Sequence, residues 1–263
     1  MKTDSGSASY NINYAGKNKL LSAEQLTAAL FTKLKDIAET ALSVKVNDVV
    51  ISVPSYFTDA ERRALLDSAK YDKKMYTIYT IFFISFYRMA GLNVLKLMND
   101  TTATALAYGI YKQDLPEPDK PSRNVVFVDC GHTGTQVAAA SFNKGKLTML
   151  ASGYCNSGGR NFDEEMCKHF AEEFSQRFKM NVFENKKATL KLLTECVKLK
   201  KLMAANTNRL PINIECFMDD KDVSGHMDRA KFEELIAGHL ADIEKVMVDV
   251  MTASKLKNEE IYR

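Results

Sequence analysis

A short apolar run that ends in an acidic turn constrains this chain more than any other feature. Val125–Val128 combines β-branched and aromatic side chains and predicts a buried strand, which Asp129 ends before a turn of small and polar residues. Gln136–Phe142 and Leu147–Ser152 predict two further strands, separated by a turn at Asn143–Lys146. We therefore expect a three-stranded meander with the acidic turn at one end.

The acidic turn has two interpretations. Backbone amides in such a turn can face phosphate oxygens, and a carboxylate at a strand tip can hold Mg²⁺ directly or through water. An Asp-x-Gly turn after a strand is also often only an ordinary turn. Asp129 and Gly131 alone leave both interpretations open.

Charge and cysteine usage exclude several classes of protein. A net charge of +3 is too small to indicate a nucleic-acid partner, so the lysines of Lys186–Lys187 and Lys198–Lys201 are expected on solvated helix faces. The five cysteines are odd in number, widely spaced and without a C-x-x-C pair, and the histidines lack metal-ligand spacing. We therefore expect no zinc site, no disulfide framework, and a reducing intracellular compartment. The N-terminus has no apolar segment typical of a signal peptide.

The first half alternates helices and strands. A weak strand is predicted at Tyr10–Tyr14, and capping boxes at Ser22–Gln25 and Thr58–Glu61 predict the starts of two helices. Further strands are predicted at Val49–Val53 and Gly91–Met98.

A short helix over Thr102–Tyr108 should follow, ending at Gly109. Leu115–Pro121 contains three prolines and predicts a linker.

The second half continues after the meander with helices and a hairpin. A glycine turn at Gly158–Gly159 leads into a helix with a phenylalanine face, and Ala188–Ala205 predicts another helix. A hairpin is expected around Asp219–Asp220. Asp228 is predicted to cap one long helix over Arg229–Thr252.

At this point the sequence resembles a known family, the seventy-kilodalton heat-shock proteins, in their nucleotide-binding domain. Four stretches carry the resemblance, in order: Val50–Arg63, Gly91–Gly109, the turn at Asp129–Gly131, and Gly158–Asp163. Other stretches resemble the large branch of that family, the 110-kilodalton or heat-shock-protein-four-like chaperones: Ile110–Pro116, Asp129–His132, Phe142–Lys146 and Ile214–Gly225. The resemblance implies an α/β protein with an actin-like ATPase, ribonuclease-H-like fold, present as an incomplete two-lobed nucleotide-binding domain.

The resemblance also implies a division of the chain and a foreign segment. We expect an N-terminal tail and remnant of an outer subdomain at 1–20, a first-lobe core at 21–120, a second-lobe meander at 121–157, an outer subdomain at 158–235, and a returning C-terminal helix at 236–263. Tyr71–Arg88 has no counterpart in the family. We interpret it as translated intron sequence or a gene-model error rather than a genuine insertion. Its apolar core is too short to span a bilayer.

Site residues carried over from the family surround ATP or ADP with Mg²⁺. Asp129 would act in catalysis and hold the magnesium through water, and Asp100 stands in place of a glutamate that orders the catalytic water. Five further residues would bind the phosphates or line the glycine turn together with Asp129: Gly131, His132, Thr133, Gly158 and Gly159. Lys201 would join Lys200 in covering the base and ribose, although an exposed helix face is an equal alternative for both lysines.

Several positions depart from the family pattern. Gly134 and Gln136 replace a threonine and an aspartate of the phosphate loop, and Val197 and Ala204 replace a glutamate and a serine that bind the nucleoside. The family's first phosphate loop and catalytic lysine are expected before this segment, and its second glycine loop after it. We therefore expect weak ATPase activity at most in the full-length protein and an inactive fragment.

Two functions follow from the resemblance and a third is disfavoured. The chain would be the ATP-binding part of a chaperone that assists folding of unfolded client proteins through a further domain and acts as a co-chaperone. The alternative is a non-enzymatic module that promotes nucleotide exchange on partner seventy-kilodalton chaperones. A sugar kinase of the same fold is disfavoured because no sugar-phosphorylating aspartate motif is present. Cytoplasmic and also nuclear residence, without nucleic-acid or membrane partners, is the expectation.

Overall fold

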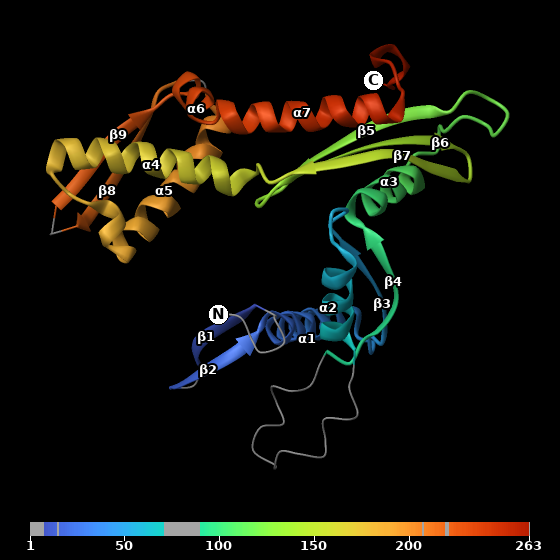
Figure 1. Ribbon diagram of the computed structural model, residues 1–263, viewed down its shortest axis with the longest axis horizontal. Coiled ribbons are helices and arrows are strands. Elements are labelled where there is room, and N and C mark those ends of the chain that lie inside the picture. The colour runs from blue at the N-terminus through green and yellow to red at the C-terminus, as the bar shows by residue number, and fades with distance from the viewer. Residues whose placement is uncertain (1–7, 15, 71–89, 207, 219–220, 263) are drawn as a thin grey trace. The chain divides into compact units, whose positions relative to one another are not determined.

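The computed structural model describes residues 8–14, 16–70, 90–206, 208–218 and 221–262 (Figure 1). The proposed foreign segment and the hairpin turn at Asp219–Asp220 lie outside the described residues. The chain divides into two compact units, Met1–Ala103 and Thr104–Arg263, and each is described by itself. The subdomain boundaries expected from the sequence remain a prediction.

The first unit begins with a hairpin and continues as a β-α-β arrangement. Strands β1 (Ser9–Tyr14) and β2 (Lys17–Ser22) pair antiparallel, so the opening segment holds one strand more than predicted. Helix α1 (Ala23–Leu42) follows directly. Strands β3 (Asp48–Val53) and β4 (Asn93–Asn99) pair in parallel.

Both predicted capping boxes in this unit are confirmed. The Ser22 side chain accepts from the amide of Gln25 at 3.3 Å, and the Gln25 side chain accepts from the amide of Ser22 at 2.9 Å. Thr58 and Glu61 repeat the arrangement at the start of α2 (Asp59–Ala69). Each box satisfies amides that the first turn of a helix leaves without partners.

Helix α3 (Asp100–Tyr111) passes the predicted end at Gly109. The backbone of Gly109 does not adopt a positive φ, so this glycine does not cap the helix. A Cβ there would lie 3.3 Å from the ring of Phe142. Close packing, rather than a turn, accounts for the glycine.

The second unit contains the predicted meander of β5 (Arg123–Cys130), β6 (Thr135–Asn143) and β7 (Lys146–Cys155), in which each strand pairs antiparallel with the next. The central strand is buried on both faces. Val137 and Ala139 pack toward α7 (Ala237–Ser254), which runs along the sheet in Figure 1. Ala140 and Phe142 face the other way, and Phe142 packs against Tyr108 with ring centroids 5.1 Å apart. Because successive side chains of a strand point to opposite faces, β6 packs against α7 on one side and against α3 on the other.

The rest of the second unit surrounds its largest hydrophobic core. The elements are α4 (Gly159–Phe178), the short 3₁₀ helix η2 (Val182–Glu184), α5 (Lys186–Ala205), β8 (Leu210–Met218), β9 (Lys221–Met227) and α6 (Arg229–Leu235). Strands β8 and β9 form the predicted hairpin. Phe170 and Phe174 are fully buried and their rings stack at 5.9 Å. The predicted phenylalanine face of α4 therefore lies in the core.

The single helix predicted over Arg229–Thr252 is wrong. Asp228 caps α6 as expected, but the helix breaks at Ile236, where ψ is 6°, and restarts as α7. Ile236 is buried, α6 packs against α4, and α7 packs against β6 and β7. Gly238 also lowers the helix propensity of the sequence just after the break.

The end of the described chain returns to the sheet. After the 3₁₀ helix η3 (Asn258–Glu260), the Tyr262 amide donates to the Asn124 carbonyl at 2.8 Å, and Ile261 forms a parallel bridge with Asn124. The Arg123 guanidinium lies 4.0 Å from the centroid of the Tyr262 ring. These contacts place the segment beside the free edge of β5.

Candidate functional site

The acidic turn is a compact loop at the end of the β5–β6 hairpin. Asp129 lies in β5 opposite Gln136, one residue before the end of the strand, and its side chain is exposed. The amide of Gly131 donates to the carbonyl of Gly134 at 3.0 Å and closes the loop. A negative charge therefore stands in solvent beside a tightly folded turn.

The Gly158–Gly159 turn docks directly on this loop. The amide of Gly159 donates to the Gly131 carbonyl at 2.9 Å, and the amide of Arg160 donates to the His132 carbonyl at 2.7 Å. A Cβ on Gly158 would lie 2.5 Å from the Gly134 nitrogen and 2.8 Å from the Gly131 oxygen. Because these neighbours are backbone atoms, only glycine fits at position 158.

The docking leaves a small set of groups open to a ligand. Among the residues that the structure describes, the amides of His132 and Thr133 donate no hydrogen bond, and both residues are exposed. The first amides of α4 are instead used by the loop carbonyls. An anion would therefore meet the loop tip rather than the start of the helix.

Lys200 is tied to the turn, whereas Lys201 is not. The Nζ of Lys200 donates to the Gly159 carbonyl at 2.9 Å and lies 2.7 Å from Oδ1 of Asp163. The Asp163 side chain is 4% exposed and that of Lys200 is 23% exposed. The Asp163 contact is an ion pair without regular hydrogen-bond geometry. Lys201 is exposed on α5, and its side chain has no ion pair or hydrogen bond within the described part of the chain.

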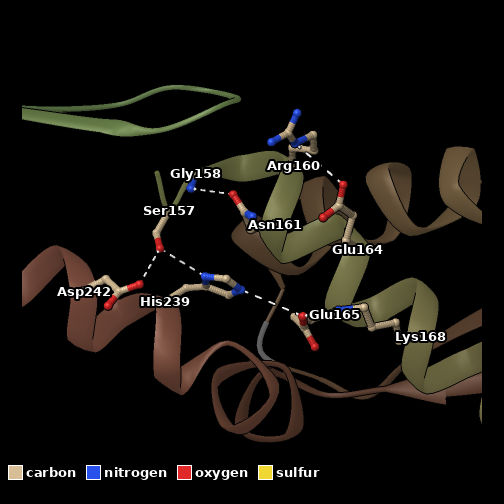
Figure 2. A network of polar contacts seen from close by, with 9 residues as sticks. All are labelled: Ser157, Gly158, Arg160, Asn161, Glu164, Glu165, Lys168, His239 and Asp242. Atoms are coloured by element: carbon tan, nitrogen blue, oxygen red, sulfur yellow. Dashed lines mark hydrogen bonds and ion pairs between the residues drawn. The ribbon is translucent and has the colours of Figure 1, made fainter. Parts of the chain in front are cut away.

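A polar network holds the residue before the glycine turn (Figure 2). Thr135 donates to the Ser157 carbonyl at 2.7 Å, and the Ser157 hydroxyl donates to Asp242 at 2.9 Å. Nδ1 of His239 lies 3.1 Å from the same hydroxyl. The turn is thereby connected both to β6 and to α7.

Two of the departures from the family pattern have a structural explanation. A Cβ on Gly134 would lie 2.7 Å from the Cys155 carbonyl, so the loop in this form excludes a side chain there. Gln136 is 9% exposed and lies within the sheet. Neither position offers the hydroxyl or carboxylate that the family pattern would place there.

Asp100 belongs to the first unit. It is the first residue of α3 and follows Asn99, whose side chain accepts a hydrogen bond from Arg62 at 2.8 Å. Its predicted role beside Asp129 therefore stays a prediction, while the other predicted residues except Lys201 are brought together within the second unit.

Three residues that organise the site were not predicted. Asn161 accepts a hydrogen bond from the Gly158 amide at 3.1 Å, and a polar residue three positions past a helix cap is a recognisable signal. Asp163 lies within a stretch that the resemblance already singled out. Ser157 has no sequence signal, because its partners are 82 and 85 residues away along the chain.

The residues around the loop fit a metal ion whose shell is completed mainly by the phosphates of a bound nucleotide and by water. Among the described residues, no group of three or more histidine, cysteine or acidic side chains could hold a metal ion. At this loop Asp129 offers an exposed carboxylate, and Mg²⁺ is often bound by one or two carboxylates when phosphates and water complete its shell. Within the same residues, no helix is long and apolar enough to cross a membrane.

The fold and the loop together define a class of protein. An antiparallel meander carrying an acidic hairpin loop, with mixed helices and strands following, is an α/β arrangement consistent with a fragment of the actin-like ATPase fold.

The comparisons with known proteins identify the family. The model of the Hsp70 protein family matches residues 1–76 and 82–263. The chain is 49% identical over 261 residues to the human heat shock 70 kDa protein 4L, 46% identical over 258 residues to the rat heat shock 70 kDa protein 4, and 47% identical over 258 residues to the 97 kDa heat shock protein of Strongylocentrotus purpuratus. These matches cover 98–99% of the chain and 27–29% of the relatives. The chain belongs to the Hsp70 family and resembles its 110-kilodalton branch.

Proposed function

We propose that this chain is part of the ATP-binding domain of a large heat-shock chaperone, which binds Mg²⁺–ATP or ADP and assists protein folding. The observation that carries the proposal is the docking of the Gly158–Gly159 turn on the loop after Asp129, with an exposed carboxylate and two open amides at its tip. The matched relatives are heat shock proteins by name, and the Hsp70 family binds nucleotide with Mg²⁺.

Each residue has a defined task in this proposal. The amides of His132 and Thr133 would donate to phosphate oxygens, and Asp129 would hold the hydrated cation. Bound Mg²⁺ would supply positive charge against the phosphates. Lys200 fixes the turn through Gly159 rather than covering the base, since its Nζ is already held. Asp100 orders water from the first unit, as the resemblance implies.

Calorimetric titration with ATP, with and without Mg²⁺, tests the proposal. The protein used should include the phosphate loop and glycine loop that the family places before and after this segment. We expect Mg²⁺-dependent binding, and we expect Asp129→Asn to lose most of the Mg²⁺-dependent part, because the amide cannot carry the charge that holds the cation.

Asp119→Asn is the matched control, since this exposed aspartate lies in the proline linker. Equal Mg²⁺-dependent affinity in Asp129→Asn and the unchanged protein would contradict the assignment. This segment alone should bind negligibly, and tight binding by it would contradict that expectation.

A second candidate function is nucleotide exchange on a partner seventy-kilodalton chaperone without hydrolysis. The absence of a side chain at Gly134 and the burial of Gln136 favour it, because both reduce the polar groups available for chemistry at the loop. Nucleotide exchange requires the protein to bind the partner's nucleotide-binding domain, and it does not require hydrolysis of the protein's own ATP.

Release of fluorescent ADP from a purified seventy-kilodalton chaperone tests this second function. We expect the full-length protein to accelerate release at stoichiometric amounts, and we expect a variant with abolished hydrolysis to retain the acceleration. No acceleration at equal concentrations would count against exchange. Loss of acceleration together with loss of hydrolysis would instead tie the effect to turnover. Cytoplasmic and nuclear residence belongs to this proposal and is checked by imaging of the tagged protein.

A further inference from the structure

Ser157 has a buried hydroxyl group that forms hydrogen bonds with two side chains of α7. The residue is 3% exposed and lies between the end of β7 and the start of α4. Its Oγ lies 2.9 Å from Oδ2 of Asp242 and 3.1 Å from Nδ1 of His239. Figure 2 shows both side chains reaching from α7 to the residue before Gly158.

The arrangement contains a serine, a histidine and an aspartate, but it is not built for nucleophilic catalysis. In a hydrolase the serine gives its proton to the histidine, whereas here the hydroxyl donates to Asp242. The nearby amides of Gly158, Gly159 and Arg160 already donate to protein acceptors, so they cannot stabilise an oxyanion. The hydroxyl is also shielded from solvent.

The hydrogen bonds assign the protonation of His239. The single O–H of Ser157 donates its hydrogen bond to Asp242, so Nδ1 of His239 must be the donor in its contact with Ser157. The proton of a neutral His239 therefore sits on Nδ1, an assignment made from partners rather than from visible hydrogens. Nε2 then has no proton, although it lies 3.9 Å from Oε1 of Glu165 on α4.

His239 also lies near side chains of α4. Its Nε2 is 3.9 Å from Oε1 of Glu165, which pairs with Lys168 at 2.7 Å. The ring of Phe162 lies on another side, with its centroid 6.2 Å from that of the His239 ring.

We propose that Ser157, His239 and Asp242 form a polar latch that positions the Gly158–Gly159 turn against the Asp129 loop. These are positioning residues, because none of them reaches the open amides of the loop. The inference rests on the proposed nucleotide function only for its consequence, since the latch itself is a property of the turn.

Amide hydrogen exchange, measured by mass spectrometry in the absence of nucleotide, tests whether the latch holds the turn. We expect amides 158–162 to be protected from exchange in the unchanged protein, because the latch holds the turn on the Asp129 loop. Ser157→Ala should lower that protection several-fold. Ser157→Thr keeps the hydroxyl and should restore most of it.

His239→Asn tests the contact from α7 to Ser157. The asparagine amide can still donate a hydrogen bond to Ser157, so part of the protection should stay. Protection that is unchanged in Ser157→Ala would overturn the latch.

The consequence for nucleotide is tested on the extended protein. Ser157→Ala should weaken Mg²⁺–ATP affinity about fivefold, which is the loss expected for one hydrogen bond that orders a binding group. A lower melting temperature with unchanged affinity and unchanged turn protection would assign Ser157 a structural role and overturn the proposal. The unchanged protein could bind no ATP while the amide hydrogen exchange results come out as expected. In that case the proposed function fails and the latch stands.

Discussion

Adjacent lysines on α5 have different roles, and the difference is set by burial. Lys200 contacts the Gly159 carbonyl and a nearly buried Asp163, whereas Lys201 is exposed. A buried carboxylate without its cation carries a large desolvation cost, while an exposed lysine contributes little to stability. The effect of removing each charge should therefore differ strongly.

Lys200→Met should lower the free energy of unfolding by about 3 kcal/mol, because it leaves Asp163 buried without a counter-ion. Lys201→Met is the matched control and should stay within about 0.5 kcal/mol of the unchanged protein. Urea denaturation followed by circular dichroism measures both. Adding Asp163→Asn to Lys200→Met should recover part of the loss. Equal stability of the two single variants would show that the ion pair does not stabilise the fold.

At the scale of elements, the packing surface decides where helices stop. The sequence of α6 and α7 is periodic throughout, yet the helix breaks at Ile236 because α6 packs on α4 and α7 packs on the sheet. Helix α3 continues past Gly109 because that glycine makes room for Phe142. The caps, by contrast, act within one turn, and Ser22, Thr58 and Asp228 begin their helices as predicted.

At the scale of the whole molecule, the two units bury apolar surface unequally. In the second unit a continuous core lies between α4, α5 and the β8–β9 hairpin, and it includes Cys167 and Cys196. In α1 of the first unit, Ala28 is buried, while Leu30, Leu34 and Ile37 are each at least half exposed. Since stabilisation follows buried apolar area, most of it resides in the second unit.

Thiol reactivity should report this core. Cys130 and Cys216 are exposed, whereas Cys196 is fully buried, and its hydrogen bond with Cys167 together with burial raises the pKa of the Cys196 thiol. Because the thiolate is the reactive form, brief iodoacetamide treatment near pH 8 should label Cys130 and Cys216 but not Cys196.

Mass spectrometry of the digested protein measures the labelling, and the same treatment in concentrated urea is the control in which all sites react. Rapid labelling of Cys196 without denaturant would mean that this core opens readily.

Local interactions explain what could be predicted. The caps and the glycine turn depend on residues within a few positions of each other, and the meander joins strands that follow one another directly along the chain, so their capping residues and periodicity are visible in the sequence. The resemblance to the heat-shock family rests on the same short stretches, and the family is shown by the match over residues 1–76 and 82–263.

The α/β class, the strand that carries Asp129 and the glycine pair that follows the meander could be predicted from the residues alone. The docking of that pair on the loop, its contact with Lys200 rather than Lys201, and the hydrogen bonds from Ser157 to α7 became known from the folded arrangement. These contacts join residues up to 85 positions apart, and pairings over such distances depend on how sheet and helices pack, which no local pattern encodes.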